Sequence, residues 1–333
     1  MTGSETNPNP IEKNPPPQGD SSAARSTRTA IAIEWIARVT ALLASLILLF
    51  ERSPRRTPFI FLGVVCIFLF LIWFSRQNRK NYGMWALYVV SLLIFSMLRP
   101  YADETNMTLH VSDLADMEAF LFGGTIPSVW LQDQFFNPRE LGPLDWFTTQ
   151  MHWSYFLMPH LMTILVFVFS PKDFERQVVT VVGIFVVGLV IYFVAPAAPP
   201  WYAARVGEIP YLFRVMNDVG AQLNAEFYST GYRAFGETNP VAAIPSLHMG
   251  VTFGLVLLAR RFSGKLAAAM FVYSLLMGFS LVYLGEHYVV DLLIGMGVAW
   301  VVYTLVDAWL DAREKRITTL EVRPQSAGAD YMA

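Results

Sequence analysis

Residues 285–310 read GEHYVVDLLIGMGVAWVVYTLVDAWL, with no charged residue between Leu292 and Val306. A helix needs about 20 largely apolar residues to cross the hydrocarbon core of a bilayer. We therefore expect residues 287–310 to span a membrane. His287 and Asp291 stand four positions apart at the start of this span, so a helix would place both side chains on one face.

The whole chain has the composition of a membrane protein. Its 333 residues are 54% hydrophobic and 15% charged, whereas about a quarter of the residues in soluble domains are charged. Because lipid offers the backbone no hydrogen-bond partners, each apolar segment should be a helix. The predicted fold class is all-α, a polytopic membrane helix bundle with about eight transmembrane helices, near residues 29–50, 57–75, 82–98, 151–170, 177–195, 246–261, 265–284 and 287–310.

These spans divide the chain into four parts. Residues 1–28 are rich in Pro, Asn, Ser and Thr and are expected to form a disordered cytoplasmic tail. Residues 29–81 hold two N-terminal membrane helices, residues 82–310 a six-helix catalytic core, and residues 311–333 a second cytoplasmic tail. Two charged residues interrupt the first span, so that segment either spans the membrane or lies tilted or at its interface.

Basic residues in the short loops predict the orientation. Lys and Arg follow the second, fourth, sixth and eighth spans, which marks that side of the membrane as cytoplasmic. The long segments 99–150 and 196–245 then lie outside, although three arginines between the first two spans oppose this assignment. Residues 112–136 in the first long segment are amphipathic, which predicts a helix on the membrane surface and is compatible with a lid over the bundle.

The pair His287 and Asp291 is the most informative feature for chemistry. A carboxylate beside an imidazole can hold one tautomer and stabilise the charged form. An aspartate flanked by apolar residues is costly in a membrane, so it should have a partner and a function. The alternative is a structural His–Asp pair that holds helices together.

A second histidine opens the sixth span. Residues 239–248 read NPVAAIPSLH, and Pro245 suits a first helical turn, where Ser246 and the free amides can bind an anion. Gly250 and Gly254 have the spacing that lets another helix approach closely. The sixth and eighth spans both begin at the outer face, so His248 and His287 should lie at one depth. Two helix starts and two histidines favour phosphoryl transfer.

Other chemistries find little support in the sequence. A single cysteine, Cys66, excludes an internal disulfide and a thiolate metal cluster. The chain lacks an HExxH motif, a Walker loop and a dinucleotide fingerprint. We therefore expect no cofactor, no metal and no nucleic-acid partner; membrane lipids are the expected donor and acceptor. The oligomeric state is left open.

At this point the motifs resemble a known family. PSLH at residues 245–248 and GEHYVVD at residues 285–291 are similar to the second and third motifs of the type 2 phosphatidic-acid phosphatase superfamily. The resemblance implies that His287 is a nucleophile that becomes phosphorylated, that Asp291 orients it, and that His248 protonates the leaving group.

Two departures from the superfamily pattern favour transfer over hydrolysis. Leu281 stands where an Arg is expected in the third motif, and Leu92 stands where the first motif has Lys. The loss of both cations resembles the phosphotransferase branch that includes inositol phosphorylceramide synthases. Residues 195–202, APAAPPWY, and Glu118 with LFGG at residues 121–124 are similar to that group, although a rigid helix stop explains residues 195–202 equally well.

The predicted function is a membrane lipid phosphotransferase that moves a phosphoinositol-like head group to a lipid or polyprenol hydroxyl through a phosphohistidine. The alternatives are a lipid or polyprenyl phosphate phosphatase and a non-catalytic lipid-binding or transport protein. We expect a multi-pass protein of a plasma or Golgi-type membrane with its site on the non-cytoplasmic face. The expected substrate-binding residues are Ser246, Tyr283, Arg99, Arg205 and Arg233, with Arg214 as a further external arginine. His110, His152 and His160 are not placed, and for His152 and His160 we expect a packing or interfacial role rather than a metal site.

Overall fold

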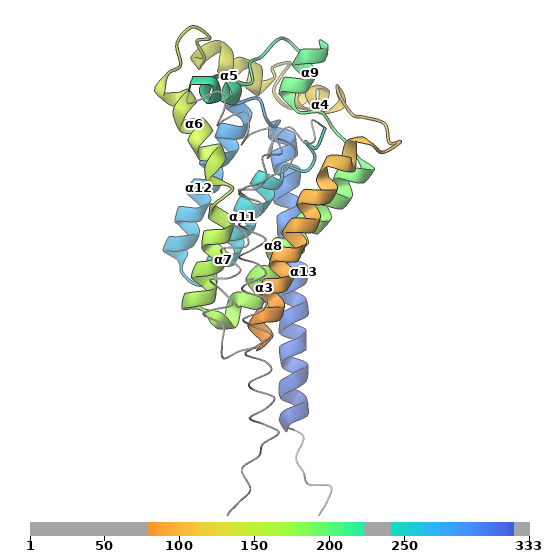
Figure 1. The fold of residues 1–333 in the computed structure, drawn as a ribbon, viewed down its shortest axis with the longest axis vertical. Coiled ribbons are helices and arrows are strands. Elements are labelled where there is room, and N and C mark those ends of the chain that lie inside the picture. The colour runs from red at the N-terminus through yellow and green to blue at the C-terminus, as the bar shows by residue number, and fades with distance from the viewer. Residues whose placement is uncertain (1–78, 223–240, 323–333) are drawn as a thin grey trace, which may run out of the picture. The chain divides into compact units, whose positions relative to one another are not determined.

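The computed structural model describes residues 79–222 and 241–322, all within the compact unit that runs from residue 53 to residue 333 (Figure 1). The described part is helical, with two isolated bridges and no strand, so the all-α class is confirmed. Its elements are α3 (Arg79–Leu98), η1 (Arg99–Asp103), α4 (Asp113–Leu121), α5 (Pro127–Phe135), α6 (Pro143–Ser154), α7 (Met158–Phe169), η2 (Pro171–Asp173), α8 (Phe174–Val194), α9 (Pro200–Val206), α11 (Leu247–Ala259), α12 (Gly264–Tyr283) and α13 (Val289–Val322).

Four described helical segments are long and apolar enough to cross a membrane: Asn81–Ala102, Pro171–Val194, Gly264–Tyr283 and Val289–Thr319. Helices α6 and α7 add a fifth span if they are taken together, with a 48° bend between them. The expected spans 29–50 and 57–75 lie outside the described residues. The described part therefore supports four or five spans, and the predicted total of about eight is not confirmed.

Helix α11 is shorter than the predicted span 246–261. Its 13 residues rise by about 20 Å at 1.5 Å per residue, whereas the hydrocarbon core is about 30 Å thick. The preceding residues 241–246 are mostly buried and lack regular helix. Irregular backbone is tolerated at membrane depth where protein surrounds it, so α11 begins inside the bundle.

Glycines allow α11 to pack closely at the centre of the bundle, where it contacts α8, α12 and α13. A Cβ atom on Gly250 would lie 3.1 Å from the carbonyl oxygen of Gly295 in α13. A Cβ on Gly254 would lie 2.6 Å from Cδ1 of Ile184 in α8. The close approach expected from the Gly250 and Gly254 spacing is therefore confirmed. Gly250 lies against α13, and Gly254 lies against α8.

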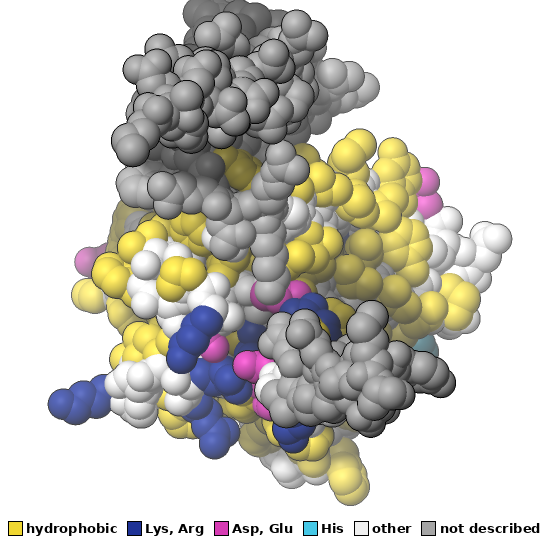
Figure 2. All heavy atoms as spheres, turned by 90° about the horizontal axis from the view of Figure 1, so that it is seen from below, with side chains coloured by type: hydrophobic (Ala, Val, Ile, Leu, Met, Phe, Trp, Pro, Cys, Tyr) yellow, Lys and Arg dark blue, Asp and Glu magenta, His cyan; other side chains and the backbone are white. Residues whose placement is uncertain are grey.

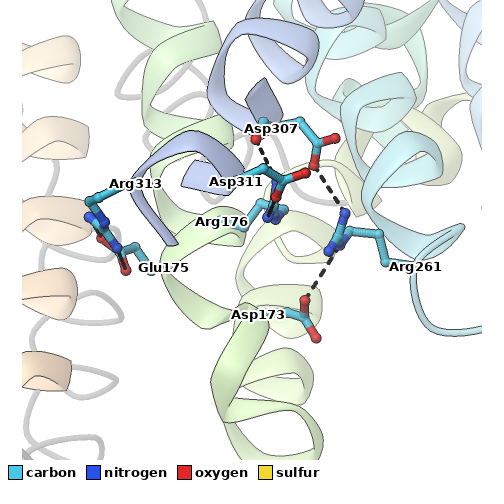
Figure 3. Close-up of polar contacts among 7 residues, drawn as sticks. All are labelled: Asp173, Glu175, Arg176, Arg261, Asp307, Asp311 and Arg313. Atoms are coloured by element: carbon cyan, nitrogen blue, oxygen red, sulfur yellow. Dashed lines mark hydrogen bonds and ion pairs between the residues drawn. The ribbon is translucent and has the colours of Figure 1, made fainter. Parts of the chain in front are cut away.

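A network of ion pairs joins α8, the α11–α12 loop and α13 at the end of the bundle where α13 extends downward in Figure 1. Figure 3 shows Arg176 of α8 between Asp307 and Asp311 of α13, at 2.6 Å from Asp311 Oδ1. Arg261 bonds Asp307 at 3.0 Å, and Arg313 pairs with Glu175 at 2.6 Å. Figure 2 views this end and shows Lys and Arg gathered on it with acidic side chains among them.

Short helices gather at the opposite end, among them α4, α5 and α9 (Figure 1). Residues 112–136 were expected to form one surface helix, but they form two, α4 and α5, because Gly123 and Gly124 between them take positive φ angles of 62° and 90°. Helix α4 packs on α13 and α5 packs on α12. Phe120 on α4 is 86% exposed, so these helices cover the bundle on one side and present apolar side chains on the other.

Candidate active site

The two histidine motifs meet where α11 and α13 begin. The ring centroids of His248 and His287 are 5.6 Å apart. His287 is buried, whereas His248 is partly exposed. The backbone N–H of Ser246 donates to the carbonyl oxygen of Asp291 at 3.2 Å and so ties the two motifs together.

His287 was expected to be the first residue of its helix, but α13 begins at Val289, two residues later. The His–Asp pair still forms, because Nδ1 of His287 lies 3.2 Å from Oδ1 of Asp291. The other oxygen of Asp291 accepts the backbone N–H of Tyr288 at 3.1 Å, and the aspartate is fully buried. Asp291 thus faces Nδ1, which leaves Nε2 as the ring atom that can attack phosphorus.

Ser246 has a structural position at the start of α11. It is the N-cap, and its hydroxyl oxygen accepts the backbone N–H of Met249 at 3.3 Å. Such a side-chain cap satisfies one of the free amides at a helix start. The side chain is fully buried, so Ser246 fixes the turn that carries His248.

A buried carboxylate caps α13 from a different element. Glu118 of α4 has no exposed surface, and its two oxygens accept the backbone N–H of Val289 at 3.2 and 3.1 Å. Burial raises the pKa of Glu118 to about 8, against the opposing effect of the Val289 hydrogen bond. In the sequence, only the resemblance to inositol phosphorylceramide synthases pointed to Glu118. The structure shows that Glu118 hydrogen-bonds the first residue of α13, two positions after His287.

An ion pair flanks His287 on its other side. Arg214 donates to both oxygens of Glu286 at 2.6 and 3.0 Å, with little exposure of either side chain. Burial alone would raise the pKa of Glu286, but Arg214 outweighs it and holds that pKa below its usual range. The guanidinium also lies 4.2 Å from the ring centre of Trp201. This arrangement fixes the residue next to His287.

The proline-rich run 195–202 connects three segments that are distant in the sequence. Ala197 forms bridges with His110 and with Ala242, and the backbone N–H of Trp201 donates to the carbonyl oxygen of Gly285 at 3.0 Å. Helix α8 ends at Val194 immediately before it. The run therefore follows the end of a helix, as one interpretation expected. Its backbone also bonds both histidine motifs, through Ala242 and Gly285.

The remaining expected substrate-binding residues have different positions. Arg99 is the first residue of η1 and is partly buried. Arg205 is exposed and stacks on Trp201 and Tyr202, with its guanidinium 5.1 and 4.9 Å from their ring centres. Arg233 lies outside the described residues.

Tyr283 does not have the open position expected of a substrate-binding residue. It is fully buried, and its hydroxyl donates to Asp145. Its carbonyl oxygen accepts Nε2 of Gln132 at 2.8 Å. Leu281, which stands in place of the family's arginine, is likewise fully buried in the apolar core. Both residues therefore hold α12 in the bundle.

Two further rings surround His248 that sequence reasoning did not place there. The ring centroid of His152 is 4.7 Å from that of His248, and the ring of Tyr155 is 4.3 Å away. His152 lies in the last turn of α6, and Tyr155 follows the end of that helix. His152 stands at the outer start of the expected span 151–170, which is the signal that could have placed it beside His248.

The other histidines lie elsewhere. Nδ1 of His160 bonds the hydroxyl of Tyr88 at 2.8 Å, and His110 pairs with Asp113 at 2.5 Å on the exposed surface. The described residues contain no cluster of three His, Cys, Asp or Glu side chains that could hold a metal ion. The arrangement of His248, His287 and Asp291 suits nucleophilic attack on phosphorus with acid–base help.

A helical bundle with membrane-spanning helices, in which two histidines and a buried aspartate meet at the starts of two helices, defines a class of lipid phosphate enzymes. The sequence of residues 113–305 matches the family model described as the PAP2 superfamily. The chain belongs to this superfamily, as the resemblance in its motifs indicated.

The chain is also similar to individual curated proteins. The chain is 25% identical over 229 residues to inositol phosphorylceramide synthase of Candida albicans, covering 65% of this chain and 47% of that protein. It is 28% identical over 213 residues to the inositol phosphorylceramide synthase catalytic subunit aur1 of Schizosaccharomyces pombe, with coverages of 62% and 49%. It is 26% identical over 245 residues to phosphoinositol dihydroceramide synthase of Bacteroides thetaiotaomicron, with coverages of 71% and 80%.

The chain thus matches about half the length of the two fungal relatives and most of the bacterial one. No solved structure matches the chain. The comparisons support an enzyme that acts on lipid phosphate groups.

Proposed function

We propose that this protein is a membrane lipid phosphotransferase that moves a phospho-head group from a phospholipid to the hydroxyl of a second lipid through a phosphohistidine. The observation that carries the proposal is the buried contact of 3.2 Å between His287 and Asp291, with the ring of His248 5.6 Å from that of His287. These three side chains supply a nucleophile, an orienting carboxylate and an acid–base group.

In the first step, Nε2 of His287 attacks the phosphorus of the phospholipid. The bond between phosphorus and the oxygen of the lipid alcohol breaks, and His248 gives its proton to that oxygen. Asp291 faces Nδ1 of His287 and stabilises the positive charge that the ring gains. The products of this step are a free lipid alcohol and a head group joined to His287 through phosphorus.

In the second step, the hydroxyl of the acceptor lipid attacks the same phosphorus. His248, now neutral, takes the hydroxyl proton, and the phosphorus–nitrogen bond breaks to release His287. The acid of the first step becomes the base of the second, so the enzyme returns to its starting protonation state. With a phosphomonoester donor and water in place of the acceptor, the same two steps would release inorganic phosphate, which is the reaction of a phosphatase.

The names of the relatives suggest the lipids. Two are named inositol phosphorylceramide synthases and one a phosphoinositol dihydroceramide synthase. By similarity, we propose phosphoinositol as the head group and a ceramide-like lipid alcohol as the acceptor. A polyprenol hydroxyl is the other acceptor class that the chemistry allows.

The charge distribution supports a site on the non-cytoplasmic face of a plasma or Golgi-type membrane. Helix α11 begins near the site and runs away from it to a basic region, with Arg260 and Arg261 in the loop and Lys265 in the first turn of α12. Helix α13 runs the same way and reaches Arg313 at that end. Basic residues favour the cytoplasmic side, so the histidines lie toward the opposite side.

A transfer assay tests the proposal. The purified protein is placed in vesicles that contain phosphatidylinositol labelled in the inositol ring and a short-chain ceramide, and the lipids are analysed by mass spectrometry. We expect labelled inositol phosphorylceramide with the wild-type protein and none with His287→Ala. Release of inorganic phosphate from phosphatidic acid without an acceptor would favour the phosphatase. Unchanged lipids with both substrates would contradict both enzymes.

A further inference from the structure

A third histidine lies against His248, and the two-step mechanism gives it no task. His152 is 4% exposed, and the ring centroids of His152 and His248 are 4.7 Å apart. Its Nδ1 atom is buried and finds no hydrogen-bond partner among the described residues. Buried polar atoms are nearly always hydrogen-bonded in native proteins, so such an atom calls for an explanation.

The ring of His248 also lies 5.6 Å from that of His287, so His152 and His287 are both neighbours of His248. Arg214 is engaged by Glu286 at 2.6 Å. Residue 281, at the end of α12, is a buried leucine and contributes no charge. An imidazole beside His248 can offer a hydrogen bond to a phosphate held between His287 and His248.

Another histidine of the same bent span gives a direct comparison. His160 of α7 lies eight positions further on, and its Nδ1 bonds the hydroxyl of Tyr88 at 2.8 Å. That ring is satisfied within the protein, away from His248. The lack of a hydrogen-bond partner at Nδ1 is therefore specific to His152 and is not shared by His160 of the same span.

We propose that His152 binds the phosphate of the donor, with its Nδ1–H donating a hydrogen bond to a non-bridging oxygen of the phosphodiester held between His248 and His287. This inference rests on the proposed function and adds a substrate preference to it. One imidazole donor suits the single negative charge of a phosphodiester better than a phosphomonoester, which carries a charge of about −1.5 to −2 at pH 7.

The test replaces one ring nitrogen at a time. His152→Asn places a nitrogen near the position of Nδ1, His152→Gln places one near the position of Nε2, and His152→Ala removes both. His160→Ala is the matched control. Two readouts are used: the rate of head-group transfer, and the rise in melting temperature that orthovanadate, a mimic of the phosphoryl transition state, gives the detergent-solubilised protein. The second readout does not depend on the choice of lipids.

We expect His152→Ala to lower kcat for transfer by about 100-fold, the size of effect seen when a transition-state donor is removed, and to lose the orthovanadate shift. The Asn variant should recover at least tenfold over Ala, and Gln should not, while His160→Ala keeps both readouts. Transfer within threefold of wild type together with a full orthovanadate shift in His152→Ala would overturn the inference. An orthovanadate shift that depends on His152 without any lipid transfer would uphold the phosphate site and contradict the proposed function.

Discussion

Substitution of Gly295 by Ala should separate the two histidine motifs. Gly295 lies one turn after Asp291 in α13, and a Cβ atom there would lie 2.3 Å from the carbonyl oxygen of Ser246 and 3.3 Å from the backbone nitrogen of Gly250. Contacts of a Cβ below 3.0 Å are essentially never seen. Because the obstructing atoms belong to backbone, α11 and α13 must move apart by at least about 0.7 Å.

The displacement is directed at the site. It opens the hydrogen bond of 3.2 Å between Ser246 and Asp291, and it moves His248 relative to His287. Overpacking of a close-packed core costs about 1–3 kcal/mol, and a misplacement of about 1 Å can cost about 100-fold in rate. We expect kcat to fall by about 10- to 100-fold and the melting temperature to fall as well.

Head-group transfer and thermal unfolding of the purified variants measure both effects. Gly297→Ala is the matched control, since it lies in the same helix and a Cβ there meets nothing within 4 Å. Alanine also favours a helix over glycine by about 1 kcal/mol, so this control should be at least as stable as wild type. Wild-type transfer by Gly295→Ala, or equal damage by both variants, would refute the reasoning about the α11–α13 contact.

Three further predictions concern charged residues. Glu118→Gln should flatten the dependence of stability on pH. The pKa of Glu118, raised from 4.5 to about 8, makes wild-type stability fall as pH rises from about 5 toward 8. Thermal unfolding of both proteins at pH 5 to 9 measures this difference. Arg176→Ala should lower the unfolding free energy by about 1–3 kcal/mol, because it leaves acidic partners of α13 without a buried guanidinium. Arg214→Ala should lower the rate of head-group transfer at least tenfold, because it leaves Glu286 buried without its partner. The double variant Arg214→Ala with Glu286→Gln should recover part of the lost rate.

Controls make each of these predictions specific. Parallel stability profiles for wild type and the Glu118 variant would contradict the first. Arg313→Ala is the comparison for the second, since that arginine is 39% exposed and exposed pairs contribute about 1 kcal/mol or less; equal losses in the two variants would count against it. A double variant that transfers no faster than Arg214→Ala alone would remove the argument for a pair.

The features that the sequence predicted well are local ones. The spacing of His287 and Asp291 predicted their contact, which forms even though the helix begins two residues later than expected. The Gly250 and Gly254 spacing predicted close helix packing. Both follow from periodicity within one segment, which residue numbers alone can convey.

The features that the sequence did not place depend on contacts between distant segments. Glu118 caps a helix that begins 171 positions later, and His152 of α6 lies beside His248 of α11. Tyr283 stands near the motif in sequence, but its hydroxyl turns toward Asp145 in the core. Local periodicity carries no information on such pairings, which the packing of the whole bundle decides.

The central claim is that His287 carries the head group between two lipids. The most direct measurement is the mass of rapidly quenched protein, with peptide mapping under alkaline conditions that preserve a phosphorus–nitrogen bond. With labelled phosphatidylinositol and no acceptor, we predict an inositol phosphate adduct on His287 that disappears when ceramide is added. Transfer by the His287→Ala variant at the wild-type rate, or steady transfer with His287 always unmodified, would contradict the account.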